Sequence, residues 1–293
     1  MTNTALAGAS APAAGLAPGL YPNLPIETYH GDRTSLSSSG ARKLLPPSCP
    51  ALFRHEQDNP RPRKAVFDFG NAAHRLVLGD GPDLVAIDAD DWRTKAARQE
   101  RDEVTAGGGL ALLVAEYDQV QHMADAIRRH PVASVLFAPG SGRPEVSVVW
   151  EDDRSGVRRR ARFDWLPNPG SGRLIIPDYK TCRSAEPSAL RRAMDEYGYH
   201  QQADWYRAAA RAVDLGGEDT AFVFVCQEKT APYLITVFEP DMSALRIAAR
   251  KNRRAITTFA KCTESGYWPG YSDGIEYLSL PPYAERRDEE EYL

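Results

Sequence analysis

Two acids and a lysine near a turn in the middle of this 293-residue chain have the types and spacing for metal chemistry. Asp164 lies near the end of one strand-like run, VRRRARFDWL, and Asp178 and Lys180 lie near the end of the next, RLIIPDYKT. Carboxylates bind divalent cations, and a nearby lysine can orient the attacking water or offset the charge that grows on a phosphate. The set is typical of a metal-dependent phosphodiesterase.

The two-residue period of a strand predicts how these side chains point. Residues i and i+2 project to the same side, so Asp178 and Lys180 should project together while Tyr179 faces the opposite way. The intervening PNPGSG is turn-forming, and an antiparallel pairing across it would bring Asp164 alongside. An acid at a strand end is more often a plain turn residue, and the lysine is what favours a site.

Further residues are weaker candidates for the same site. Gln202 and Tyr206 are four apart in YHQQADWYRAAA and therefore share a helical face, as they also would in a structural helix with a polar edge. His74 follows Gly70 by four residues in an apolar helical pattern and is either a packed core residue or a ligand. Glu145 opens the strand-like EVSVVWED and could equally be a surface acid.

The elements that must hold these residues follow the order helices, three-strand meander, long helix, two strands, helix. Alternation and β-branched residues predict strands over 145–152, 157–166, 173–181, 220–227 and 233–240. A helical pattern runs from Pro187 to Val213 with a bend at Gly198, and Asp241 should cap a basic helix ending near Glu264. Residues 92–130 are charged and helix-favouring, interrupted by glycines at 107–109. This order predicts a mixed α/β domain.

Composition sets limits on the function. Hydrophobic residues make up 42% and charged residues 26% of the chain, and 36 basic against 40 acidic residues give a net charge of −4. An acidic balance counts mildly against nucleic-acid binding, although arginines cluster beside Asp164 and again over 246–254. No apolar run approaches the ~20 residues of a membrane span, and no basic region precedes the Ala/Gly/Pro-rich start. We therefore expect a cytoplasmic protein without membrane contact.

The cysteines give no sign of a metal centre. Cys49, Cys182, Cys226 and Cys262 are scattered, and no C-x-x-C spacing occurs. Zinc sites usually require closely spaced thiols, and isolated cysteines in a chain without a signal peptide fit reduced cytoplasmic thiols. The chain also lacks a Walker A motif, so no ATP requirement is expected.

Taken in order, these motifs resemble a known nuclease superfamily. G-x-x-x-H (Gly70 to His74), an acid after a basic strand (Asp164), D-x-K (Asp178 to Lys180) and Q-x-x-x-Y (Gln202 to Tyr206) are similar to the PD-(D/E)XK nucleases. Within that superfamily the chain most resembles the exodeoxyribonuclease VIII (RecE-type) nuclease domain of phages and prophages. Two further segments, SLSSSGARKLL and GYWPGYSDGIEYLSLPPYA, share the likeness, which extends over about residues 21–283.

The resemblance implies a fold and a domain plan. The fold is an α/β, restriction-endonuclease-like PD-(D/E)XK core with a central mixed β-sheet flanked by helices. We expect residues 1–20 to be a disordered tail, 21–283 to be a single nuclease domain, and 284–293 to be an acidic tail. Within the domain, 21–140 would be a helical part and 141–283 the catalytic core.

The resemblance also implies roles for the candidate residues. Asp164, Asp178, the backbone carbonyl of Tyr179 and His74 would bind the metal. Lys180 would activate or orient water, Gln202 and Tyr206 would steady the site or contact DNA, and Glu145 occupies a position where relatives often have an acid. Some relatives hold an iron–sulfur cluster with clustered late cysteines; here only Cys262 lies late, so no cluster is expected.

The implied activity is Mg²⁺-dependent, ATP-independent exonuclease degradation of linear duplex DNA, with Mn²⁺ as a substitute. Relatives degrade one strand from the 5′ end and leave a 3′ overhang for a single-strand annealing protein of the RecT type, and they form rings around DNA. A phage- or prophage-encoded enzyme in a bacterial cytoplasm is implied. Two alternatives stay open: an endonuclease of the same fold, and a recombination module that binds DNA without catalysis.

Overall fold

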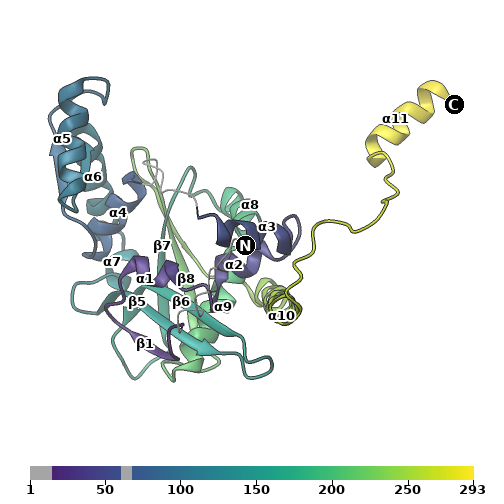
Figure 1. Cartoon of the computed structure of the whole chain (residues 1–293). Helices are drawn as coiled ribbons and strands as arrows, with labels where there is room; N and C mark the ends of the chain where they lie inside the picture. The colour runs from purple at the N-terminus through teal and green to yellow at the C-terminus, as the bar shows by residue number, and fades with distance from the viewer. Residues whose placement is uncertain (1–14, 61–67) are drawn as a thin grey trace, which may run out of the picture.

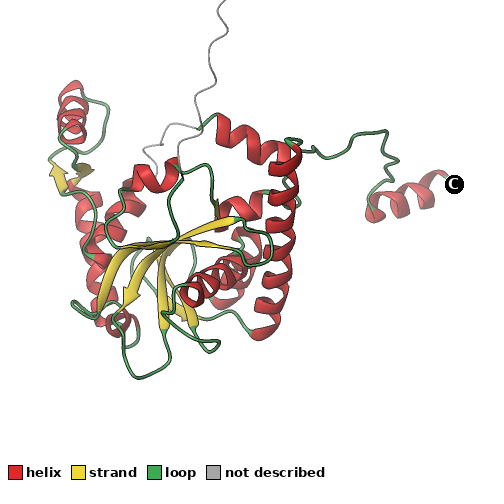
Figure 2. Cartoon of the chain, turned by 60° about the horizontal axis from the view of Figure 1, so that its bottom comes forward, coloured by secondary structure: helices red, strands yellow, loops and turns green. Residues whose placement is uncertain are grey.

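Two groups of strands form the centre of the computed structural model, which describes residues 15–60 and 68–293. One sheet has the order β1-β5-β6-β2 and the other β7-β8-β9, and Figure 2 shows the strands as a central layer with helices around it. The strands are β1 (Gly19–Tyr21), β2 (Leu36–Ser37), β5 (Gly142–Glu151), β6 (Arg158–Pro167), β7 (Ile175–Cys182), β8 (Ala221–Glu228) and β9 (Ile235–Phe238). Each sheet combines parallel and antiparallel pairs, so the predicted mixed α/β class is confirmed.

Strands β5 and β6 form the hairpin that the alternating pattern predicts. Their antiparallel register pairs Pro144 with Trp165 and Val146 with Phe163, which places Glu145 directly across from Asp164. Cross-strand neighbours of this kind have Cβ atoms about 5 Å apart. The hairpin therefore brings two acids from distant parts of the sequence together.

The expected three-strand meander is wrong in its last pairing. β7 forms its ladder with β8, in parallel, and the crossover between them is helical. Toward β6, the Tyr179 N–H donates instead to the carboxylate of Asp164 at 2.9 Å, while Pro177, two residues earlier and facing the same way, has no N–H to donate. A side chain therefore replaces the ladder at the point where β6 and β7 meet.

Helices cover both faces of β7 and β8, as Figure 1 shows. On one face Ile176, Phe222 and Phe224 join a core with the helices that follow the sheet, and on the other Tyr179 and Val225 join a core with the preceding helices. The helices are α1 (Ile26–Gly31), α2 (Ser38–Lys43), α3 (Pro50–Asp58), α4 (Asp68–Leu78), α5 (Lys95–Ala106), α6 (Val114–Arg129), α7 (Ala133–Leu136), α8 (Pro187–Tyr197), α9 (Tyr199–Ala212), α10 (Met242–Ser265) and α11 (Pro282–Tyr292).

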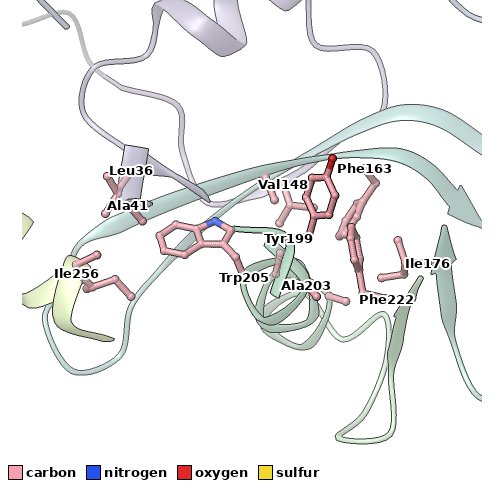
Figure 3. Close-up of a cluster of buried hydrophobic side chains, with 14 of the residues drawn as sticks. Leu36, Ala41, Val148, Phe163, Ile176, Tyr199, Ala203, Trp205, Phe222 and Ile256 are labelled. Carbon is pink, nitrogen blue, oxygen red and sulfur yellow. The ribbon is translucent and has the colours of Figure 1, made fainter. Parts of the chain in front are cut away.

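The larger core is built around Trp205 of α9, whose side chain is fully buried (Figure 3). Its indole N–H donates to the Arg160 carbonyl of β6 at 3.0 Å, so the ring is both packed and hydrogen-bonded. Phe163, Phe222 and Ile176, from the strands, lie in the same core (Figure 3). Helix α9 is thereby fixed against the strands that carry the candidate residues.

The predicted bend in the long helix is a left-handed glycine. Gly198, at φ 68°, ends α8 and begins α9, and a Cβ there would lie 2.8 Å from the Cδ of Arg42. Both the backbone angle and the space favour glycine. Asp241 caps α10 by accepting from the Ala244 N–H at 2.7 Å, as the sequence predicts.

Several short elements lie in the segments at either end of the expected catalytic core. Most of the expected disordered tail, residues 1–14, lies outside the described residues, but Gly19–Tyr21 pairs with β5 and satisfies the open edge of that strand. The helical part over 21–140 also holds a small parallel pair, β3 (Leu84–Ile87) with β4 (Leu110–Leu113). The acidic tail lies in α11, which begins at a proline and is rich in helix-forming glutamate and arginine. Among the described residues, no helix is long and apolar enough to cross a lipid bilayer.

Candidate active site

The candidate residues converge where β5, β6 and β7 come together between α4 and α9. His74, Glu145 and Asp164 each offer a ligand atom, and these atoms all lie within 4.8 Å of one another. Oxygen and nitrogen ligands ~2.1 Å from a common ion lie up to ~4.2 Å apart, so small side-chain shifts would close this group around a cation. Glu145, the weakest candidate from sequence, belongs to the group.

The backbone of Glu145 is strained at this point. Its φ is 54°, in the left-handed region that residues with a Cβ rarely adopt. Such conformations cost of order 1 kcal/mol or more and persist where the surroundings hold them. Here Arg162 holds the carboxylate through an ion pair of 2.5 Å between Nε and Oε2, and the unusual backbone directs the acid to Asp164 and His74.

Asp178 and Lys180 project to the same side of β7, as the strand period predicts. Lys180 Nζ lies 2.5 Å from Asp178 Oδ2 as an ion pair, and the other oxygen, Oδ1, accepts from the Gln202 amide at 2.6 Å. Oδ2 nevertheless has no well-directed hydrogen-bond partner among the described residues, although Asp178 is buried. A buried carboxylate oxygen short of donors is what a cation ligand presents before the ion binds. The donor set therefore fits a divalent metal.

The electrostatics of the two aspartates follow from burial. Burial raises the pKa of Asp164 to about 6, against the opposing charge of Lys180. Burial also raises the pKa of Asp178 to about 6, and the negative charge of Asp164 adds to the effect while Lys180 again opposes it. A cation placed between these two carboxyls would stabilise their ionised forms.

Lys180 and His74 take the protonation states that such a site requires. Burial disfavours the charged lysine, but Asp178 and Asp164 outweigh burial and raise its pKa, so Lys180 is a cation at neutral pH. Burial lowers the pKa of His74, and the charge of Lys180 lowers it further. A neutral imidazole is the form that binds metals.

Tyr179 and Tyr206 support the site from opposite sides. The buried Tyr179 ring faces away from Asp178, lies 5.1 Å edge-on from the His74 ring, and donates its hydroxyl to Gln227 at 2.6 Å. Tyr206 packs between Phe163 at 5.5 Å and Phe222 at 5.0 Å, and burial, with nearby acids, raises its pKa well above the usual value. Tyr206 is thus a neutral hydroxyl in the wall of the site.

Sequence reasoning noted the arginines beside Asp164 but assigned them no role in holding the acids. Arg162 also donates to the Leu24 carbonyl at 2.8 Å, which ties Glu145 to the chain before α1. Arg160 and Arg162 lie 5.3 and 5.8 Å from the ring of Tyr29 in α1. The alternation of VRRRARFD places Arg160, Arg162 and Asp164 on one face of β6, which is the signal that could have indicated this role.

The comparisons with known proteins agree with this fold. A family model described as a PDDEXK-like domain of unknown function (DUF3799) matches residues 37–281. A crystal structure of a "Putative exonuclease" from Eubacterium rectale is similar over 88% of this chain and 96% of that one, with 15% identity and a TM-score of 0.58. The crystal structure of SSO0001 is 15% identical, and the match covers 68% of this chain and 81% of that one. Its TM-score of 0.29 is too low to support the fold assignment. No curated protein matches the sequence.

The matched region contains all the candidate residues, from His74 to Tyr206. It also contains most of the fold, from the start of α2 to the segment before α11. The resemblance to the PD-(D/E)XK superfamily is confirmed at that level, and the chain belongs to the family of PDDEXK-like domains of unknown function, DUF3799.

Proposed function

We propose that this protein is a divalent-metal-dependent exodeoxyribonuclease that degrades linear double-stranded DNA. The observation that carries the proposal is the partly buried meeting of His74, Glu145 and Asp164 beside the Asp178–Lys180 pair. Packing alone would not bring three acids together where burial disfavours the charged forms of Asp164 and Asp178. A cation and a phosphate explain the arrangement.

The metal would be held by His74, Glu145 and Asp164, with Asp178 and the Tyr179 carbonyl as further ligands on β7. When bound, such an ion lowers the pKa of a coordinated water and neutralises charge on the scissile phosphate. The oxygen-rich set suits Mg²⁺, and the imidazole makes Mn²⁺ an effective substitute. Glu145 is kept in place by Arg162, and Asp178 by the amide of Gln202.

Lys180 has the position and charge to act on the nucleophile. Its ammonium contacts Asp178 at 2.5 Å and remains protonated at neutral pH because two acids raise its pKa. It therefore donates hydrogen bonds to the attacking oxygen or a phosphate oxygen and does not take a proton. Tyr206, neutral for the same range of pH, can donate to DNA or steady the wall of the site.

The biological setting that we propose rests on the family resemblance. Degradation from the 5′ end would leave a 3′ overhang for a RecT-type annealing protein, in a phage-derived recombination system of the bacterial cytoplasm. Assembly as a ring around DNA would account for a net charge of −4, since only the channel needs to be basic. No ATP would be required.

Digestion of linear duplex DNA with and without Mg²⁺ tests the proposal. The parent protein, Lys180→Ala and the matched surface variant Lys261→Ala would be assayed on linear DNA and on a closed circle of the same sequence. We expect Mg²⁺-dependent loss of linear DNA with the parent and Lys261→Ala only. Cleavage of the circle would favour an endonuclease. No cleavage of either DNA, with binding retained, would favour a non-catalytic module.

A further inference from the structure

A long arm leaves the body of the protein after α10 and ends in α11 (Figure 1). Its root is fixed, because the Ala51 N–H donates to the Pro269 carbonyl at 3.0 Å and Trp268 stacks on Phe53 at 5.7 Å. Beyond the root, Ile275, Tyr277 and Leu278 are 94%, 99% and 90% exposed. Large apolar side chains this exposed in succession indicate a surface that is covered by another molecule.

Helix α11, at the end of the arm, is strongly acidic. Five acids, Glu285, Asp288, Glu289, Glu290 and Glu291, outnumber its two arginines, and its one ion pair among the described residues is internal, between Arg287 and Asp288 at 2.7 Å. No part of the described body contacts these acids with a basic side chain. Two features of the arm, acid and apolar surface, are therefore left without a partner.

A groove with the opposite character lies on the body. It has a volume of about 1260 Å³ and lies between the ends of β5, α9 and the middle of α10. Six arginines line it (Arg154, Arg159, Arg211, Arg250, Arg253 and Arg254), against four acids. The acids Asp152 and Asp204 are already engaged by Arg253 and by Asn252.

The outer wall of this groove is free to bind an anionic surface. Arg250 and Arg254 are exposed, one turn apart on α10, and neither has an acidic partner within ion-pair distance in the described parts of the chain. Deeper in, the buried Arg159 has an Nε without a hydrogen-bond partner. Ile247, on the exposed side of α10 before the groove, is 54% exposed and offers apolar contact.

We propose that α11 of one copy docks in the arginine-lined groove of a second copy of this chain. Charge favours the pairing, and an 11-residue helix is ~16 Å long, which suits a groove of this volume. The root of the arm lies at the far end of α10 from Arg250, and Figure 1 shows the arm running away from the body. An arm of 267–281 can span up to ~50 Å, enough to reach a neighbour.

The contact is head-to-tail, because the arm and the groove are different surfaces. Repeated head-to-tail contacts close into a ring or continue as a chain, according to the rotation between copies. The proposal goes beyond nuclease activity and does not depend on it, since it concerns surfaces outside the candidate active site. Its test therefore measures mass and not cleavage.

A charge exchange between two variants tests the proposal and separates it from docking of the arm on its own groove. The tail variant carries Glu285→Lys, Glu289→Lys and Glu290→Lys, and the groove variant carries Arg250→Glu and Arg254→Glu. Masses are measured by light scattering after size exclusion, over a range of concentrations. Glu100→Lys and Arg98→Glu, both exposed on α5, make single changes of the same kind as controls.

We expect the parent and the controls to associate, and each variant alone to have a dissociation constant raised by ~10-fold or more. An equal mixture of the two variants should associate again, because each tail then meets a groove of opposite charge. Three results would overturn the proposal: a parent that stays at the monomer mass of 32.4 kDa at all concentrations, reversals that leave the association unchanged, or a mixture that stays monomeric.

Discussion

The two ends of the β5–β6 hairpin treat a buried acid in opposite ways. At one end the carboxylate of Asp152 accepts from both terminal nitrogens of Arg253 at 2.7 Å and from Ser155 at 2.8 Å. Burial alone would raise its pKa, but these donors lower it to about 2. At the other end Asp164 has the Tyr179 N–H at 2.9 Å and an acid opposite it, and its pKa is raised to about 6.

The difference separates a structural acid from an acid kept for a ligand. Donors that neutralise Asp152 are supplied by the protein, so that its charge stabilises the native fold. Asp164 and Asp178 also have partners, namely the Tyr179 N–H, Lys180 and Gln202, but these do not offset burial. Their charges therefore oppose folding until a cation arrives. Within one hairpin, the supply of donors distinguishes the two roles better than burial, which is high at both ends.

The largest expected effect follows from removing an acid that the protein does not neutralise. Asp164→Asn keeps the shape and can still accept from the Tyr179 N–H, but it removes a ligand and one of the three local acids. We expect metal-dependent cleavage to fall by ~10³-fold, since loss of one such electrostatic partner costs ~10²–10³ and a ligand is also lost. Mg²⁺ should raise the melting temperature of the parent and leave that of Asp164→Asn unchanged.

Removing Asp152, the acid that the protein does neutralise, should lower stability and leave cleavage almost unchanged. Asp152→Ala leaves Arg159, held 4.6 and 4.0 Å from the rings of Trp150 and Trp205, without its nearest counter-charge. We expect the free energy of unfolding to fall by about 3 kcal/mol, because a buried charge is left unpaired. Denaturant titration measures this, and the cleavage rate at a permissive temperature should stay within ~2-fold of the parent.

The pH dependence of stability should also differ in sign between the two ends. In the metal-free protein Asp164 and Asp178 hold protons that the unfolded chain releases above about pH 4, so the free energy of unfolding falls between about pH 4 and 6 by about 5 kcal/mol for the two acids together. Asp152 has a depressed pKa, so its contribution is present above about pH 4 and is lost as the pH falls toward 2.

Urea titrations from pH 4 to 7.5 in chelator resolve these contributions. Asp164→Asn should flatten the decline between pH 4 and 6, whereas Asp152→Asn should leave that decline in place. A parent protein whose stability rises steadily from pH 4 to 6 without metal would contradict the assignment of Asp164 and Asp178 as acids whose partners do not offset burial.

The smallest effect is expected where a side chain only steadies a ligand. Gln202→Ala removes the amide that donates to Asp178 at 2.6 Å but leaves every proposed ligand in place. Partners of this kind change metal affinity by ~10–100-fold when removed, and we expect ~10-fold, read as a shift in the Mg²⁺ concentration that gives half-maximal cleavage. Equal cleavage at saturating Mg²⁺ would distinguish this role from a direct part in the reaction.

The sequence predicted those parts of the fold that depend on local pattern. Period-two alternation gave the β5–β6 hairpin, Gly198 marked the bend between α8 and α9, and Asp241 marked the start of α10. The same period placed Asp178 and Lys180 on one side of β7. Each of these is decided by residues within a few positions of one another.

What could not be predicted depends on contacts between distant segments. The absence of a ladder between β6 and β7 depends on Pro177 and on the carboxylate of Asp164, which takes the place of a ladder acceptor. The importance of Glu145 depends on its register opposite Asp164 and on a backbone angle that no local pattern encodes. His74 is brought to the acids by the packing of α4 on β7, which its neighbours in sequence do not specify.

The left-handed backbone of Glu145 has a consequence for directed evolution of this protein. Glycine adopts φ 54° without strain, and the buried acids beside it oppose folding when no metal is bound. A library selected for heat resistance in chelator should therefore accumulate Gly or Asn at position 145 and amides at 164 and 178. Thermostability gained in this way would be matched by lost turnover, so the positions enriched by such a selection would trace the outline of the catalytic centre without a single nuclease assay.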